Sequence, residues 1–306
     1  MVASGPGPEG VIGFVENESR LTLNLPVFDL PISCRRVLLL LLSLCASRTS
    51  TAPTAIYSIT LDEGTRAFVK RPNECSPDMR NGGGDLVEGR VMYQGKCEGA
   101  GVAPAIYERD GMRYLKFATD PSYQGKTKTR SELALTGRWF PFGEPVYVGF
   151  RTRIPKEADR TQAFFYMMQF WQCAGASPIG GVRISRGYSH RVNFMTRSDS
   201  RAASMATYDL SPDTWTSFVI KVSVDPGGKK GSFAVWNDPE DDPRAYNGPY
   251  GYAEEGRCKD EIEPPQRFRI KFGIYKGNEN NKLYEVDYDD IRIGNTFDTV
   301  SPWKTS

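Results

Sequence analysis

The chain has 306 residues, 39% hydrophobic and 12% aromatic, which is enough to bury one large core. Its formal net charge of +2 provides no whole-molecule field for nucleic acid, so we expect no nucleic-acid partner, although a local basic cleft for an acidic substrate stays open. With 30 glycines, 21 prolines and 15 tyrosines, the composition suits many short strands joined by turns. We also expect the protein to be a monomer.

The first 55 residues are predicted to be a leader. Arg35 and Arg36 precede the apolar run VLLLLLSLC at 37–45, and small and polar residues follow as far as Ala55. This nine-residue run is too short to cross a bilayer but has the length of a signal-peptide core. We therefore expect a signal peptide within residues 1–55, secretion to the extracellular space and no membrane partner. Because 34 residues lie ahead of Arg35, a different start residue, a buried strand or a disordered leader stays open.

Four cysteines remain once such a leader is removed: Cys75, Cys97, Cys173 and Cys258. An even number in a secreted chain predicts two disulfides, for which three connectivities are open. We favour Cys75 with Cys97, which flank a glycine-rich stretch, and Cys173 with Cys258; four reduced thiols are the alternative. The absence of a CxxC pair and the single histidine argue against a zinc site.

From residue 56 onward the sequence predicts short strands and turns. No amphipathic helix of useful length occurs, and the only loop-rich insert is 239–265. Such a chain predicts an all-β, antiparallel β-sandwich of the jelly-roll type, as one domain over 56–306. The strands are expected at residues 55–61, 111–119, 128–135, 147–154, 162–173, 181–186, 190–196, 215–224, 231–237, 267–276 and 284–293.

Three of these strands carry polar residues on one face. In KTRSELAL, at 128–135, alternation places Lys128, Arg130 and Glu132 together. The strand QAFFYMMQFWQC, at 162–173, is apolar or aromatic on both faces and therefore is covered on both sides or lines a cleft.

The strand RFRIKFGIYK, at 267–276, alternates most clearly. Its phenylalanines and isoleucines face a core, and Arg269, Lys271, Gly273 and Tyr275 face the other way. A glycine between a lysine and a tyrosine is predicted to leave room for something to approach, as on the floor of a binding groove. An ordinary solvated sheet face is the alternative.

These segments resemble a known family. TRSEL (129–133), MQFW (168–171), KFGIYKG (271–277) and YDDIRIG (288–294) are similar to motifs of the jelly-roll polysaccharide lyases. Glucuronan lyases and heparin lyase I-type enzymes are the nearer relatives, and alginate lyases are more distant. The resemblance covers roughly residues 56–302.

The resemblance implies cleavage of a polyuronate, an acidic polysaccharide, by β-elimination, with no cofactor for catalysis. Gln169 matches the family's glutamine, which neutralises the substrate carboxylate, and Tyr275 matches the tyrosine that acts as base, as acid or as both. A free phenol loses its proton near pH ~10, so Arg130 and Lys271 are expected to supply positive charge beside it. Arg130 is also expected to pair with a substrate carboxylate, and Glu132 to orient Arg130.

One departure from the family concerns Trp171. Heparin-type and many alginate-type relatives carry a histidine there, and a histidine is the more natural base near neutral pH. Its replacement favours a glucuronan lyase, with Trp171 and Lys128 among the substrate-binding residues. A non-catalytic carbohydrate-binding jelly roll stays open as an alternative. A glycoside hydrolase ranks last, because it needs two carboxylates and Glu132 is the only acid in the three motif strands.

The single histidine, His190, shares a face with Val192 and Phe194 of the strand expected at 190–196. We expect a structural role, because nothing in its spacing marks a set of ligands. Asn193 faces the opposite way. We expect it to point into the groove and bind substrate, with an ordinary polar sheet position as the alternative.

Acidic residues lie near both ends of the predicted sandwich. Asp62 and Glu63 follow the first strand, and Asp287, Asp289 and Asp290 lie in the last. If the ends pair, Asp62 and Asp289 are candidate ligands of a structural Ca²⁺, as relatives of this family carry. Ordinary turn and surface acids are the alternative.

Overall fold

The computed structural model describes parts of residues 53–306. The predicted leader, Asp62, Cys75, Cys173 and Cys258 all lie outside the described residues. Within these residues, no helix is both long and apolar enough to span a membrane. The described residues are 57–61, 85–88, 91–125, 128–135, 138–160, 165–172, 177–197, 202–225, 229–248, 266–276 and 282–303.

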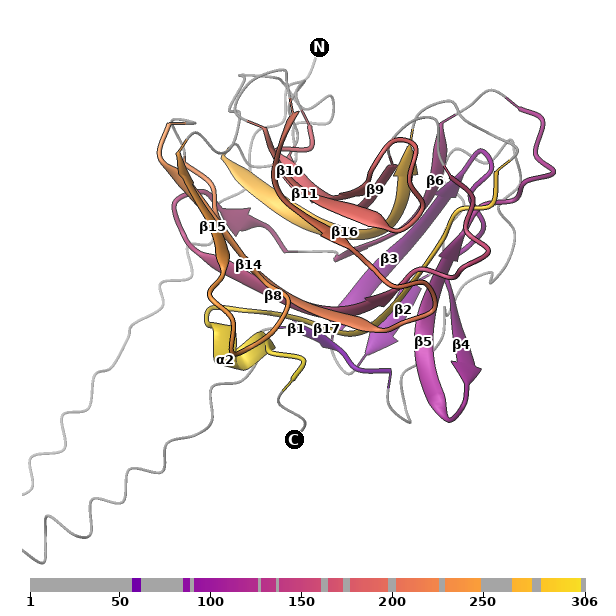
Figure 1. Cartoon of the computed structure of the whole chain (residues 1–306), viewed down its shortest axis with the longest axis horizontal. Coiled ribbons are helices and arrows are strands. Elements are labelled where there is room, and N and C mark those ends of the chain that lie inside the picture. The colour runs from indigo at the N-terminus through magenta and orange to yellow at the C-terminus, as the bar shows by residue number, and fades with distance from the viewer. Residues whose placement is uncertain are drawn as a thin grey trace, which may run out of the picture. The chain divides into compact units, whose positions relative to one another are not determined.

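The described strands form two antiparallel sheets that pack on each other (Figure 1). The first sheet has eight strands. In spatial order they are β15 (Arg244–Gly248), β14 (Gly231–Trp236), β13 (Thr216–Ser223), β8 (Val146–Arg153), β17 (Glu285–Gly294), β5 (Met112–Ala118) and β4 (Ala105–Arg109), with β1 (Tyr57–Ile59) paired to β17.

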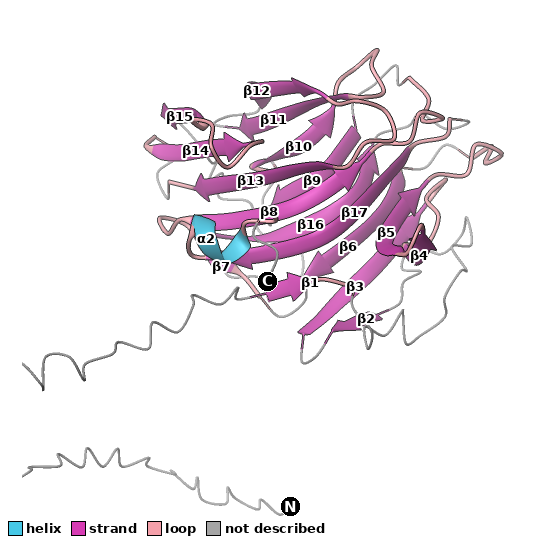
Figure 2. Ribbon diagram, turned by 60° about the horizontal axis from the view of Figure 1, so that its bottom comes forward, coloured by secondary structure: helices cyan, strands magenta, loops and turns pink. Residues whose placement is uncertain are grey.

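The second sheet has nine strands. Figure 2 shows the strands running side by side, with the short helix α2 (Phe297–Val300) over β8. In spatial order the nine-stranded sheet comprises β12 (Ala202–Asp209), β11 (Arg191–Arg197), β10 (Gly180–Ile184), β9 (Phe165–Trp171), β16 (Arg267–Lys276), β6 (Thr129–Leu135), β3 (Val91–Glu98) and β2 (Asp85–Glu88), with β7 (Phe140–Pro141) paired to β16.

One core fills the space between the sheets, and strand alternation builds it. Phe268, Ile270, Phe272 and Ile274 of β16 are each at most 1% exposed, and Phe272 meets Tyr288 of the facing sheet edge-on at 5.7 Å between ring centroids. Burying each such side chain contributes about 1.5–3 kcal/mol. The prediction of an all-β, antiparallel sandwich is confirmed.

Several strands have no counterpart among the predicted ones. They are β2, β3, β4, β7, β12 and β15, and β15 lies inside the segment 239–265 that was expected to be loop-rich. That expectation was wrong for residues 244–248, because RAYNG pairs with β14 at the sheet edge although its composition is typical of a turn. The strand β12, AASMATYD, carries small and polar residues that give no clear alternation.

A bulge beside the middle of β9 disturbs the register on both of its sides. Tyr166 and Met168 pair with positions on β10 and β16, whereas Met167 between them has no register partner on either strand. The Tyr288 hydroxyl of the opposite sheet crosses the core and donates a 2.7 Å hydrogen bond to the Met167 carbonyl. Since a buried carbonyl without a partner is costly, this bond stabilises the bulge.

The bulge also corrects the role predicted for Gly273. This residue has a φ of +112°, and an added Cβ would lie 2.2 Å from the Ser131 carbonyl oxygen and 2.5 Å from the Phe117 ring. The glycine is therefore required by the backbone and by core packing at the bulge. It does not open the floor of a groove, as the sequence suggested.

We predict that Tyr288→Phe destabilises the fold by about 1–3 kcal/mol, because the Met167 carbonyl loses its buried donor. Chemical denaturation followed by tryptophan fluorescence measures this change. The matched control is Tyr107→Phe, since Tyr107 is 46% exposed and its loss of a hydroxyl should change stability by less than about 0.5 kcal/mol. Equal effects of the two substitutions would show that the crossing hydrogen bond does not stabilise the bulge.

Candidate active site

The three motif strands β6, β16 and β9 are direct neighbours in the nine-stranded sheet. Lys271 of β16 lies opposite Gln169 of β9, and Tyr275 lies opposite Arg130 of β6. Together with Glu132 these residues define what we call the concave face, on the side of the sheet away from the core. In Figure 1, β16 and its neighbours curve with their hollow side turned away from the eight-stranded sheet. The structure thus brings together the residues that the sequence proposed.

Glu132 is the centre of this cluster. It is only 3% exposed, its Oε2 lies 3.1 Å from Arg130 Nε, and its Oε1 accepts a hydrogen bond from the Gln169 amide. Burial raises the pKa of the Glu132 carboxyl, and Lys271, Arg130 and Gln169 offset part of that rise. Glu132 therefore contacts Arg130 of its own strand and Gln169 of β9 and acts electrostatically on Lys271 of β16, a wider role than orienting Arg130.

Lys271 is the second buried charge, at 7% exposed. Its Nζ lies 4.1 Å from the centroid of the Trp171 ring. Burial lowers the pKa of Lys271 to about 8, an effect that Glu132 opposes and Arg130 adds to. A lysine in this environment is cationic at neutral pH and sits close to losing its proton in mildly alkaline solution.

Tyr275 is half-buried and surrounded by positive charge. The guanidinium carbon of Arg130 lies 5.1 Å from its ring centroid, and Lys128 Nζ lies 5.9 Å away. Both cations approach the π face, where they are attracted to the ring. Across the next strand, Tyr275 pairs in register with Tyr166.

Trp171 lies at one end of the cluster. Its ring packs beside that of Trp139, with centroids 5.9 Å apart, and the Arg269 guanidinium lies 4.0 Å from the Trp139 ring centroid. The place where the resemblance expects a histidine is thus filled by an aromatic pair with two cations over it. This arrangement offers an apolar surface and positive charge in place of an imidazole.

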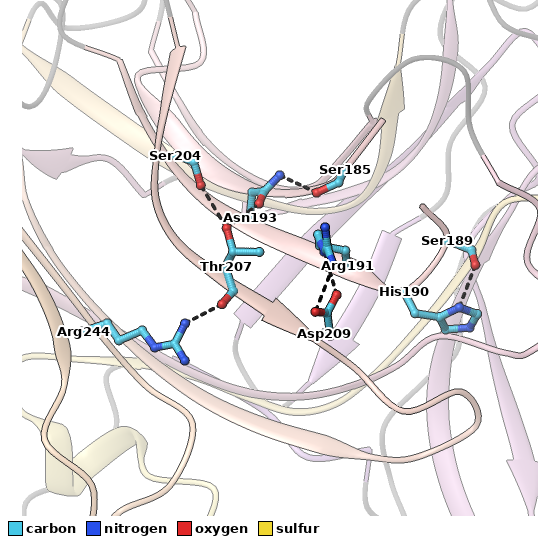
Figure 3. A network of polar contacts seen from close by, with 9 residues as sticks. All are labelled: Ser185, Ser189, His190, Arg191, Asn193, Ser204, Thr207, Asp209 and Arg244. Carbon is cyan, nitrogen blue, oxygen red and sulfur yellow. Dashed lines mark hydrogen bonds and ion pairs between the residues drawn. The ribbon is translucent and has the colours of Figure 1, made fainter. Parts of the chain in front are cut away.

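Asn193 lies on β11, two strands from β9 (Figure 3). Its amide donates to Ser185 Oγ at 2.5 Å and accepts from Thr207 Oγ1 at 2.8 Å. By register its side chain shares the concave face, and its proposed contact with substrate stays a prediction. These two hydrogen bonds fix the orientation of the amide.

The single histidine, His190, immediately precedes β11 (Figure 3). His190 Nδ1 is 2.7 Å from Ser189 Oγ, and Nε2 is 3.1 Å from the Pro155 carbonyl oxygen. Both ring nitrogens therefore contact protein atoms. The structural role of His190 stays a prediction, and these contacts support it.

The calcium hypothesis gains no direct support. Asp62 lies outside the described residues, and Asp289 Oδ2 lies 3.2 Å from Arg151 Nη1. In the part of the chain that the structure describes, no group of three or more His, Cys, Asp or Glu side chains could hold a metal ion. Asp287 pairs instead with Arg153 at 2.6 Å, and burial raises its pKa to about 6 despite this partner. A structural Ca²⁺ remains an untested prediction.

Sequence reasoning missed several residues of the concave face. Glu98 of β3 lies 3.8 Å from Arg130 Nε, so two carboxylates flank that guanidinium. The sequence does not predict the strand β3, and it does not distinguish Tyr166 from the other aromatic residues of β9. Strand pairing was the missing signal, since it places β3 beside β6 and Tyr166 beside Tyr275.

Solved structures resemble this chain at low identity. An endo-β-1,4-glucuronan lyase from the fungus Trichoderma reesei is 13% identical, with 82% of this chain and 100% of that chain covered and a TM-score of 0.49. The alginate lyase AlgAT5 of polysaccharide lyase family 7 is 13% identical, with coverages of 62% and 82% and a TM-score of 0.41. The cellulose-induced protein Cip1 is 14% identical, with coverages of 78% and 97% and a TM-score of 0.43.

No curated protein matches the chain significantly. A family model described as polysaccharide lyase matches residues 102–292, which is more than half of the 306 residues and includes β6, β9 and β16. The predictions of the family and of a lyase activity are confirmed. The chain belongs to the polysaccharide lyase family.

Proposed function

We propose that this lyase is secreted and cleaves a polyuronate, glucuronan in preference to others, by β-elimination without a cofactor for catalysis. The observation that carries the proposal is the convergence of Tyr275, Gln169, Arg130 and Lys271 around buried Glu132 on one sheet face. Elimination next to a carboxylate requires a group that transfers protons and donors that neutralise the carboxylate. The phenol, the amide and the two cations on this face supply both.

The first requirement is to neutralise the substrate carboxylate. The C5 proton of a uronate is barely acidic while the neighbouring carboxylate carries its full charge, so donors must stabilise the enolate-like intermediate. Gln169, Lys271 and Arg130 supply an amide, an ammonium and a guanidinium. Glu132 contacts Gln169 and Arg130 and attracts Lys271 before substrate arrives, and preorganised donors stabilise a transition state most strongly.

The second requirement is a pair of proton transfers. In the proposed step, Tyr275 as phenolate takes the C5 proton, the C5–H electron pair forms the C4=C5 double bond, and the C4–O bond breaks. The leaving oxygen takes both bonding electrons and receives the proton from the Tyr275 phenol, which regenerates the phenolate. Arg130 and Lys128 lie over the ring of Tyr275, so positive charge lies next to the residue that takes and returns the proton.

The preference for glucuronan follows from Trp171. No imidazole occupies this position, and the ring nitrogens of His190 contact Ser189 and Pro155, so we assign proton transfer to Tyr275. The Trp139 and Trp171 rings offer an apolar surface against which a sugar ring can pack. Heparin-type cleavage, which the resemblance associates with a histidine, is not expected.

We predict that the purified protein generates ultraviolet absorbance from glucuronan, because elimination leaves a conjugated 4,5-unsaturated uronate. Glucuronan, alginate, heparin and pectate should be tested in parallel, with and without Ca²⁺, and new reducing ends should be measured alongside absorbance. Heparin should give little signal. New reducing ends without absorbance would indicate hydrolysis and direct attention to Glu98 and Glu132, and binding without either signal would refute turnover of the polymer tested.

We predict that Tyr275→Phe lowers kcat by at least ~10³-fold, since it removes only the oxygen that transfers protons. Gln169→Ala should lower kcat by ~10²-fold, because carboxylate stabilisation matters most in the transition state. Initial rates of absorbance change measure both effects.

His190→Ala is the matched control for these variants and should retain most of the activity. Circular dichroism and affinity for glucuronan should be nearly unchanged in Tyr275→Phe. If Tyr275→Phe stayed active while His190→Ala lost activity, the two roles would have to be exchanged.

The proposal of secretion rests on the predicted leader, and the cysteines provide a test of it. Cys97 is disulfide-bonded, which agrees with an oxidising compartment, and its partner lies outside the described residues. We predict that peptide mass spectrometry of the secreted protein, without reduction, finds Cys75 joined to Cys97 and Cys173 joined to Cys258. Each bond typically contributes ~2–4 kcal/mol to stability. Four free thiols would contradict both the pairing and the secretion.

A further inference from the structure

A row of side chains crosses the concave face beyond Tyr275. In successive registers, Tyr275 of β16 lies opposite Tyr166 of β9, Tyr166 opposite Arg183 of β10, and Arg183 opposite Asn193 of β11. Neighbouring strands are about 4.8 Å apart, so the row extends roughly 14 Å from Tyr275 across the strands. An extended polymer that reaches Tyr275 and lies across the strands would pass over Tyr166 and Arg183.

Positive charge gathers at this part of the row. Arg183 and Tyr166 share a side-chain hydrogen bond, and Arg197 is close enough to act electrostatically on both. Burial and the neighbouring Arg197 together lower the pKa of Arg183, although a guanidinium remains charged in a protein. Two like charges beside one neutral phenol repel each other, and an anion bound between them relieves that repulsion.

The backbone next to this charge leaves the sheet surface without a side chain. Gly181 of β10 lies opposite Gln169 on one side and Met195 on the other. Its φ is +153°, and an added Cβ would lie 2.2 Å from the Met168 carbonyl oxygen, so no larger residue fits this backbone. Gly181 is buried; it lies two residues from Arg183 and directly opposite the residue that we assign to carboxylate neutralisation.

Another arginine on this face differs in its surroundings. Arg191 of β11 donates two hydrogen bonds to Asp209, at 2.7 and 3.1 Å (Figure 3). Its guanidinium lies 4.0 Å from the Tyr188 ring centroid. Its charge is already paired with a carboxylate. Removing it changes the net charge by the same amount as removing Arg183, which makes Arg191 a matched control.

We propose that Arg183, with Arg197 and the Tyr166 hydroxyl, forms a carboxylate-binding subsite that holds the uronate residue next to the one at Tyr275. The ligand class is a carboxylated sugar polymer lying across the strands. This subsite rests on the proposed function in one respect, the choice of a polyuronate as ligand. It adds a specificity element, because the subsite selects polymers that carry a carboxylate on consecutive sugars.

The test measures binding apart from turnover. The full chain carrying Tyr275→Phe is titrated by calorimetry with glucuronan, with alginate and with carboxyl-reduced glucuronan, which keeps the backbone of the polymer and lacks its charge. Adding Arg183→Gln should weaken binding of the charged polymers about tenfold, as expected for a lost charge-assisted hydrogen bond, and should leave binding of the reduced polymer unchanged. Arg183→Lys should recover part of the affinity, and Arg191→Gln should change it less than twofold.

Arg197→Gln provides a second variant if Arg183→Gln lowers the melting temperature, and it should also weaken binding of the charged polymers selectively. Equal losses for Arg183→Gln and Arg191→Gln, or an equal loss with the carboxyl-reduced polymer, would overturn the subsite. A chain that forms no double bond from glucuronan, yet binds a polyuronate through Arg183, would refute the proposed function and support the subsite. Failure of every charged polymer to bind would overturn the subsite.

Discussion

The candidate site depends on one buried carboxylate. Moving Glu132 out of water costs several kcal/mol, and the sheet compensates by surrounding it with Arg130, Gln169 and Lys271. These three partners come from three different strands, so the order β9, β16, β6 is as necessary to the site as the residues themselves. The donors are therefore held in position by the protein, and substrate binding does not have to order them.

Much of the architecture follows from local patterns in the sequence. The strand β16 has the predicted bounds, 267–276, because its period of two is uninterrupted, and every residue of β9 except Trp171 is buried, as its apolar composition indicated. The edge strands β12 and β15 escaped prediction, since strands with little to bury need no strong alternation and their residues occur equally in turns. These segments are strands because they form hydrogen bonds with a neighbouring strand, and the local sequence does not reveal that pairing.

The site was predictable as a set of residues but not as a geometry. Motif residues on alternating positions of three strands indicated which side chains face together, and the structure brings them together. The contact between Gln169 and Glu132, and the place of Tyr166 beside Tyr275, depend on strand register and on the bulge at Met167. A shift of one residue reverses every side chain along a strand, and nothing in the local sequence fixes that choice.

The hydrogen bond from Tyr288 to Met167 links the two sheets across the core. Tyr288 packs in the core against Phe117, Phe150 and Phe272, yet the carbonyl that it holds lies between Tyr166 and Gln169 on the strand that carries both. An evolving lineage can thus adjust the spacing between these two side chains by exchanging residues in the interior, with the exposed surface unchanged. Variation confined to the core would then alter preference among polymers, and searches for specificity determinants should extend to positions that substrate never touches.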